Sequence, residues 1–126
     1  MRIFKNKWFQ RWARKEGVSD AALCEAAREV VAGVVDADLG GCLFKKRIAR
    51  AGSGKSGGYR LLIGYKKPEN ERIIFIFAFA KNEKANIKKT EEIILRKVAE
   101  KFFLASDDQI KALLELGEAW EVKNNE

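Results

Sequence analysis

The segment from Arg72 to Ala80, RIIFIFAFA, is apolar at every position after the first. An uninterrupted apolar run of this length is typical of a central strand that is covered on both faces. The rest of the chain must therefore supply apolar cover for two sides of a sheet. With 126 residues and 47% hydrophobic content, one ordinary domain spanning residues 1–126 can bury such a core without disulfides or metals.

Two segments before this run predict partner strands. Residues 59–66 alternate apolar side chains on one face with a mixed second face that carries Arg60. Residues 39–50 alternate as well, and they place Lys45 and Arg47 on one face. Lys46 falls on the other face, between Phe44 and Ile48. Together with residues 72–80, these segments predict an antiparallel meander, and a weaker alternation predicts a short strand at residues 2–7.

Helical spacing predicts cover for this sheet. Trp8, Phe9, Trp12 and Ala13 recur on one side of a helix that Gly17 can end. We interpret them as a core-facing stripe in preference to base-stacking aromatics, because one helical period directs them the same way. A second helix over residues 20–34, capped by Ser19, completes a helical hairpin.

The C-terminal part of the chain is predicted to be helical. Residues 86–104 show a third amphipathic pattern, and the capping box SDDQ at 106–109 opens a short helix before the tail EAWEV. The predicted fold class is α+β, with the helical hairpin packed on the meander and the later helices following it.

The amino-acid composition limits the kinds of catalysis and metal binding that the chain can support. The chain has a net charge of +7, a pI near 9.5 and no histidine. Acid-base catalysis by histidine is therefore excluded, and we expect no metal and no cofactor. Cys24 and Cys42 lack the spacing of a metal or redox pair and are expected to be free, inert thiols. No apolar run is long enough for a membrane span and no signal peptide is visible, so we expect a cytoplasmic protein without a membrane partner.

The charge is concentrated in the middle of the chain. Residues 39–68 contain eight Lys or Arg residues and no Asp or Glu, which favours a polyanionic partner. Within this stretch, GSGKS resembles a nucleotide-binding phosphate loop. The match fails because Ala49 stands where the pattern needs glycine, and because the segment leads into a strand where a helix is required.

The strand pattern instead predicts a cluster of cations. Lys45 and Arg47 share a face, Arg60 can point the same way from the next strand, and Lys81 follows the end of the apolar strand. The simpler interpretation of such a charge run is a positively charged surface that only contacts solvent. The absence of acidic residues in this stretch and the neighbouring glycines favour a phosphate-binding site instead. If the phosphate is RNA, the 2′-hydroxyl can serve as nucleophile, Arg47 and Arg60 can stabilise the phosphate charge, and Lys45 or Lys81 can act as base or acid.

These segments resemble a known family. The order strand, helical hairpin, three-stranded meander and helix, with KKRIAR, GKSGGYR and FAKNEKANI at the strand ends, is similar to the RelE/HigB toxins of bacterial type II toxin-antitoxin pairs, in the RelE/ParE superfamily. The resemblance covers residues 2 to about 104 and leaves 105–126 as a C-terminal extension. It implies a microbial ribonuclease-type fold that enters the ribosome and cuts translated mRNA.

The resemblance also implies partners and site residues. The partners would be the ribosome, its mRNA and a cognate antitoxin, expected to be of the helix-turn-helix type. By position, the family's catalytic cluster corresponds to Lys45, Arg47, Arg60 and Lys81. Further RNA contacts are expected from five residues near it: Lys46, Arg50, Lys55, Asn82 and Lys84.

Two alternatives remain open. One is a ParE-like, non-catalytic inhibitor of DNA gyrase, and the other is a non-catalytic RNA-binding module. Two positions depart from many RelE/HigB enzymes, because Asn82 stands where an Arg is common and Ile87-Lys88 where a base-stacking Tyr is common. Tyr59 and Tyr65 alternate onto the core face, so they are not expected to replace that Tyr.

Overall fold

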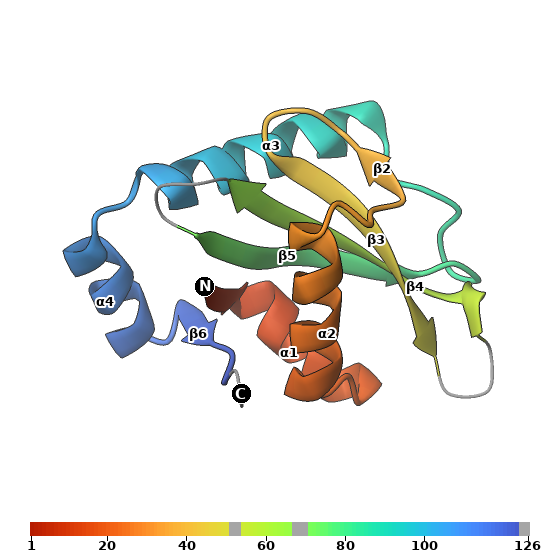
Figure 1. The fold of residues 1–126 in the computed structure, drawn as a ribbon, viewed down its shortest axis with the longest axis horizontal. Helices are drawn as coiled ribbons and strands as arrows, with labels where there is room; N and C mark the ends of the chain where they lie inside the picture. Colours follow the sequence, from red (N-terminus) through yellow and green to blue (C-terminus); the bar gives the residue numbers. More distant parts are fainter. Residues whose placement is uncertain (51–53, 67–70, 124–126) are drawn as a thin grey trace.

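The computed structural model describes residues 1–50, 54–66 and 71–123, with only the backbone at 54–56. It has an α+β fold, as predicted (Figure 1). The elements in chain order are β1 (Arg2–Asn6), α1 (Lys7–Glu16), α2 (Asp20–Val31), β2 (Ala37–Asp38), β3 (Leu43–Arg50), β4 (Gly54–Lys66), β5 (Arg72–Ala80), α3 (Lys89–Leu104), α4 (Asp107–Glu115) and β6 (Ala119–Glu121).

The strands form one mixed sheet in the order β2-β3-β4-β5-β1-β6. The antiparallel meander β3-β4-β5 is confirmed, and β5 has the predicted bounds. Besides the two-residue strand β2, two features of the sheet were not predicted. β1 pairs with β5 in parallel, and the tail forms β6, which pairs with β1 in antiparallel register. The first and last strands therefore lie side by side at one edge of the sheet (Figure 1).

The helical hairpin covers one face of the sheet (Figure 1). The Asn6 side chain accepts from the Phe9 N–H to cap α1, and Gly17 ends the helix in the left-handed region that glycine favours. Phe9 and Leu23 then pack against Phe75 in the core beneath the hairpin. We name this side of the sheet the hairpin face.

Helix α3 covers part of the opposite side, which we name the α3 face. It comes closest at Gly64, where a Cβ atom would lie 3.1 Å from the Ala99 Cβ and 3.3 Å from the Phe103 Cζ. The absence of a side chain at Gly64 thus lets the helix lie directly on β4. The second core, which includes Leu43, Ile74 and Phe102, is buried beneath α3 and α4.

A buried arginine sets the corner between α3 and α4. Arg72 is 3% exposed and donates to the carbonyl oxygens of Phe102 and Ala105 at 3.3 and 2.7 Å. It also donates to the Asp107 carboxylate at 2.7 Å. These bonds satisfy carbonyl groups at the end of α3 and hold α4 beside it. The predicted capping box at Ser106 and Gln109 is confirmed.

Several predicted boundaries were wrong. The strand predicted at 59–66 begins earlier, at Gly54, because pairing with β3 supplies hydrogen bonds that local propensity does not register. The predicted strand at 39–50 begins only at Leu43, since positive φ angles at Gly40, Gly41 and Cys42 turn the chain after β2. α2 ends at Val31 and α3 begins at Lys89, both inside their predicted ranges.

The predicted stripe on α1 is confirmed only in part. Phe9 and Ala13 are buried and Trp12 is half-buried, but Trp8 is 42% exposed. Helical spacing gave one direction to all four side chains. Trp8, however, lies in the first turn, and its ring packs on Phe77 with 4.5 Å between ring centroids.

Two buried lysines tie the hairpin to the sheet. Lys46 is 3% exposed on the hairpin face, and its Nζ lies 3.0 Å from the Glu29 carboxylate on α2. Lys5 is 7% exposed and bonds Asp20, also on α2, at 3.0 Å. Because an unpaired buried charge is costly, these acids fix α2 over the lysines.

Replacing Glu29 with Ala should therefore be strongly destabilising. The change leaves the Lys46 ammonium buried without its carboxylate, at a cost of about 3 kcal/mol in the free energy of unfolding measured by urea denaturation. Glu25→Ala, an exposed change on the same helix, is the matched control and should cost less than about 0.5 kcal/mol. Equal effects of the two variants would contradict a structural role for the Glu29–Lys46 pair.

Candidate nucleic-acid interface

The strand register brings the predicted cations together on the α3 face. The Cα atom of Arg47 lies directly opposite that of Arg60, and Arg60 in turn lies opposite Phe79 on β5. Lys45 is two residues before Arg47 and opposite Leu62, which is buried in the second core. The Lys81 N–H donates to the Gly58 carbonyl oxygen at 3.3 Å, so Lys81 continues the β4–β5 ladder just past Ala80. We name these four residues, Lys45, Arg47, Arg60 and Lys81, the cationic cluster.

The members of the cationic cluster differ in exposure. Arg47 and Lys81 are exposed and Lys45 is half-buried, whereas Arg60 is 7% exposed. Like charges at directly opposite positions of an antiparallel pair destabilise it. The arrangement places the buried Arg60 beside the exposed Arg47, and the exposed side chains of Arg47 and Lys81 suit contact with an anion.

Arg47 also has an acidic partner that was not predicted. Its Nε lies 2.7 Å from Asp36 Oδ1, and its backbone N–H donates to Asp36 Oδ2 at 2.6 Å. Residues 39–68 contain no Asp or Glu, but the prediction that their basic side chains would have no acidic neighbours was wrong. The fold brings Asp36 to Arg47 and Glu29 to Lys46 from earlier in the chain. Asp36 lies just before the two-residue strand β2, where no periodic pattern could have revealed this contact.

The pKa of Asp36 reflects this contact. Burial of the carboxyl group raises its pKa, but the Arg47 backbone N–H and guanidinium lower it more, so that the pKa lies below its ordinary value. The carboxylate therefore stays charged and fixes the direction of the Arg47 side chain, which remains 45% exposed. Asp36 is a positioning residue for Arg47.

The segment that links β5 to α3 borders the cationic cluster. Lys45 Nζ bonds Asn86 Oδ1 at 3.4 Å, and Ile87 packs against the second core. Asn82 is exposed, while the Lys84 ammonium is held by both oxygens of Glu91 at 2.8 Å. Of the two further RNA contacts predicted here, Asn82 is thus exposed and Lys84 is engaged in an ion pair.

Two of the other predicted RNA contacts, Lys46 and Arg50, do not join the cluster. Lys46 lies on the hairpin face, paired with Glu29. The Arg50 guanidinium lies 5.4 Å from the centroid of the Tyr59 ring, which belongs to the core beneath the hairpin. The side chain of Lys55 lies outside the described residues. Tyr59 and Tyr65 are 4% and 9% exposed, so their predicted place in the core is confirmed.

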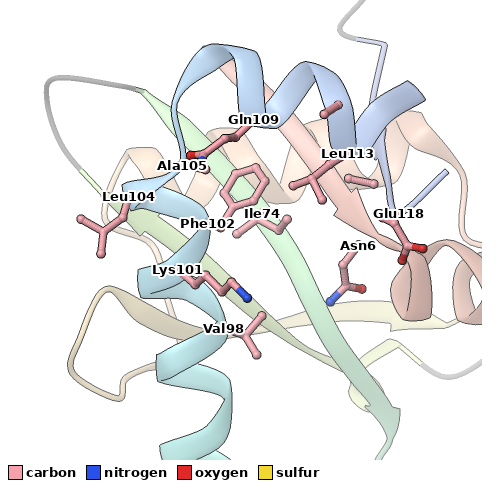
Figure 2. Close-up of a pocket in the computed structure, with 12 residues that line it drawn as sticks. Asn6, Ile74, Val98, Lys101, Phe102, Leu104, Ala105, Gln109, Leu113 and Glu118 are labelled. Carbon is pink, nitrogen blue, oxygen red and sulfur yellow. The ribbon is translucent and has the colours of Figure 1, made fainter. Parts of the chain in front are cut away.

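An apolar pocket of about 640 Å³ lies at the other end of the α3 face (Figure 2). Val98 and Phe102 of α3, Leu113 of α4 and Ile74 of β5 contribute apolar walls, and Lys101 and Glu118 are its charged residues. None of the cationic cluster lines it. Among the described residues, no group of three or more Cys, Asp or Glu side chains could hold a metal, and no helix is long and apolar enough to cross a membrane.

Comparison with known proteins gives a match to one family model. The model, described as the RelE toxin of the RelE / RelB toxin-antitoxin system, matches residues 1–122. The chain belongs to the RelE toxin family. Comparisons with curated proteins and with solved structures found no match.

The family match confirms the resemblance seen in the sequence and extends it. The chain is a RelE-family toxin of a type II toxin-antitoxin system, and its implied partner is a RelB antitoxin. The match passes the predicted limit near residue 104 and includes α4 and β6. This agrees with the pairing of β6 to β1 in the toxin sheet.

Asp36→Asn in the RelE-family chain should lower stability at neutral pH and free Arg47 to move. We expect a loss of about 1 kcal/mol at pH 7, because the charge-assisted bonds are partly exposed to solvent. The folded pKa of Asp36 lies below the unfolded one. Its contribution is therefore complete above the unfolded pKa of about 3.9 and is lost as pH falls through the folded pKa.

The check is denaturant unfolding of wild type and variant at pH 7 and at pH 2. The difference between the two proteins should shrink at the lower pH. A difference that is the same at both pH values would contradict the assigned ion pair.

Proposed function

We propose that this toxin is a ribosome-dependent mRNA endonuclease that needs no metal for the chemical step. The observation that carries the proposal is the direct opposition of Arg47 and Arg60 on neighbouring strands, with Lys45 on the same face. Two arginines at directly opposite positions on one sheet face suit contact with a phosphodiester, because guanidinium groups donate to phosphate oxygens. A surface that only binds protein has no need of this arrangement.

In the proposed reaction, the 2′-oxygen of the nucleotide before the cut attacks the adjacent phosphorus. A base removes the 2′-hydroxyl proton as the new P–O bond forms, and an acid donates a proton to the 5′-oxygen as the old bond breaks. The products are a 2′,3′-cyclic phosphate and a free 5′-hydroxyl. Arg47 and Arg60 stabilise the charge on the non-bridging oxygens, a role typically worth about 10²–10³ in rate per donor.

Lys45 and Lys81 are the proposed base and acid, in either order. Arginine cannot take this part because it stays protonated. Lys45 is held by Asn86, and Lys81 is exposed at the end of β5, so the two amines approach the phosphate site from opposite strands of the meander. Asn82, also exposed, is proposed as an additional RNA contact.

Primer extension on a translated mRNA, with and without ribosomes, tests the proposal. Cuts that appear only with ribosomes support it. Uncut mRNA together with inhibition of gyrase supercoiling would favour the ParE-like alternative instead. Binding of RNA without cuts in either condition would favour the non-catalytic RNA-binding module.

Arg47→Ala should reduce the single-turnover cleavage rate on ribosomes by about 10²–10³-fold, because one donor to the phosphate oxygens is lost. It should also relieve growth inhibition while leaving capture of the antitoxin intact. The matched control is Arg11→Ala, which removes an exposed arginine from α1. A well-folded Arg47→Ala toxin that cleaves as fast as the control would contradict the assigned role.

A further inference from the structure

We propose that Trp8 is an RNA-binding residue, whose indole ring stacks on a base of the strand held at the cationic cluster. The inference rests on the proposed function insofar as it takes RNA as the ligand. It adds a contact for the base, whereas the cationic cluster can recognise only the phosphate.

The local structure explains why Trp8 is exposed. The β1–β5 pairing ends at Lys5 and Phe75, and the Asn6 side chain then donates to the Ile76 carbonyl oxygen at 3.0 Å as the chain turns into α1. Within the described part of the chain, no strand pairs with β5 on that side after this point. Trp8, in the first turn of α1, lies beside this edge of β5, where its ring packs on Phe77.

The ring of Trp8 is held in place without being buried. Its centroid lies 4.5 Å from that of Phe77 and 6.4 Å from that of Trp12, with only 11° between the two indole planes. It nevertheless keeps 42% of its surface exposed. A large ring that is fixed by its neighbours can accept a base at a small cost in side-chain entropy.

A row of aromatic rings joins Trp8 to the cationic cluster. Phe77 and Phe79 are two residues apart on β5, and their ring centroids are 6.4 Å apart. Phe79 lies directly opposite Arg60. The row therefore runs along β5 from the exposed indole of Trp8 to the position next to the buried Arg60.

Charge complementarity favours RNA as the occupant of this surface. A positively charged groove that follows the backbone, with aromatic rings on which bases stack, is the usual combination in proteins that bind single strands. Here Phe77 and Phe79, which link Trp8 to the cluster, lie on β5 next to Arg60 on β4, and the chain carries a net charge of +7. A protein partner on the exposed ring is the competing possibility, and the experiment below separates the two.

The test compares three variants of the full-length toxin. Trp8→Leu keeps apolar cover on the edge of β5 but removes the ring, and Trp8→Phe keeps a ring. Leu116→Ala alters an exposed apolar residue at the C-terminal cap of α4. The probe is a labelled single-stranded RNA with 2′-O-methyl riboses, which cannot be cleaved through the 2′-oxygen. Thermal unfolding establishes that each variant is folded.

We expect Trp8→Leu to raise the Kd for this RNA about tenfold, as for the loss of one stacked base. Trp8→Phe should restore most of the affinity, and Leu116→Ala should leave it unchanged. The slope of log Kd against log salt should be the same for wild type and Trp8→Leu, because no phosphate contact is lost. A purely structural role for Trp8 would not produce this combination.

Two results would overturn the proposal. One is an unchanged Kd for folded Trp8→Leu, or no binding of the RNA by the wild type. The other is weaker antitoxin binding by Trp8→Leu with unchanged RNA binding, which would make the surface a protein-docking site. Failure of the proposed function gives a different result. If the toxin does not cleave mRNA on ribosomes but its RNA binding still depends on Trp8, the nuclease function is rejected and the stacking contact is retained.

Discussion

The apolar strand β5 is the constraint on which the rest of the structure depends. Both of its faces must be covered, and the chain covers them unequally. The helical hairpin packs along one face, while α3 covers only part of the other, where it packs on β4 and β5 and Gly64 lets it approach closely. The part of the α3 face beyond this contact carries Lys45, Arg47 and Arg60. Incomplete cover of one sheet face thus creates the candidate site.

Basic residues on the two faces of the sheet differ in how they are paired with acids. On the hairpin face, Lys5 and Lys46 are buried and paired with acids of α2, so their charges serve to hold the helix. On the α3 face, Asp36 directs Arg47 but does not bury it, and the Arg47 side chain stays exposed to solvent. Adjacent residues of one strand, Lys46 and Arg47, therefore have different roles because the pleat turns them to opposite sides.

The sequence predicted those parts of the fold and site that carry a periodic signal. The bounds of β5 follow from its unbroken apolar run, and the shared face of Lys45 and Arg47 follows from alternation in β3. β2 and β6 were missed because two or three residues have no measurable period. Their positions depend on pairing with distant strands.

Tertiary contacts explain the remaining errors at the site. The acid-free stretch suggested unopposed cations, yet Asp36 reaches Arg47 from outside that stretch. Trp8 was assigned to the core because helical spacing describes a helix alone, whereas its exposure depends on where β1 stops beside β5. Neither contact is local in sequence, so neither is visible in a residue pattern.

The central claim is that the α3 face, and not the hairpin face, receives RNA. The most direct measurement is a two-dimensional NMR titration of isotope-labelled toxin with a short, non-cleavable RNA, following each backbone amide. The account predicts that the largest shifts fall on β3, β4 and the end of β5, around residues 45, 47, 60 and 81, with α2 unaffected. Shifts concentrated on α2 and the hairpin turn, or none at saturating RNA, would contradict it.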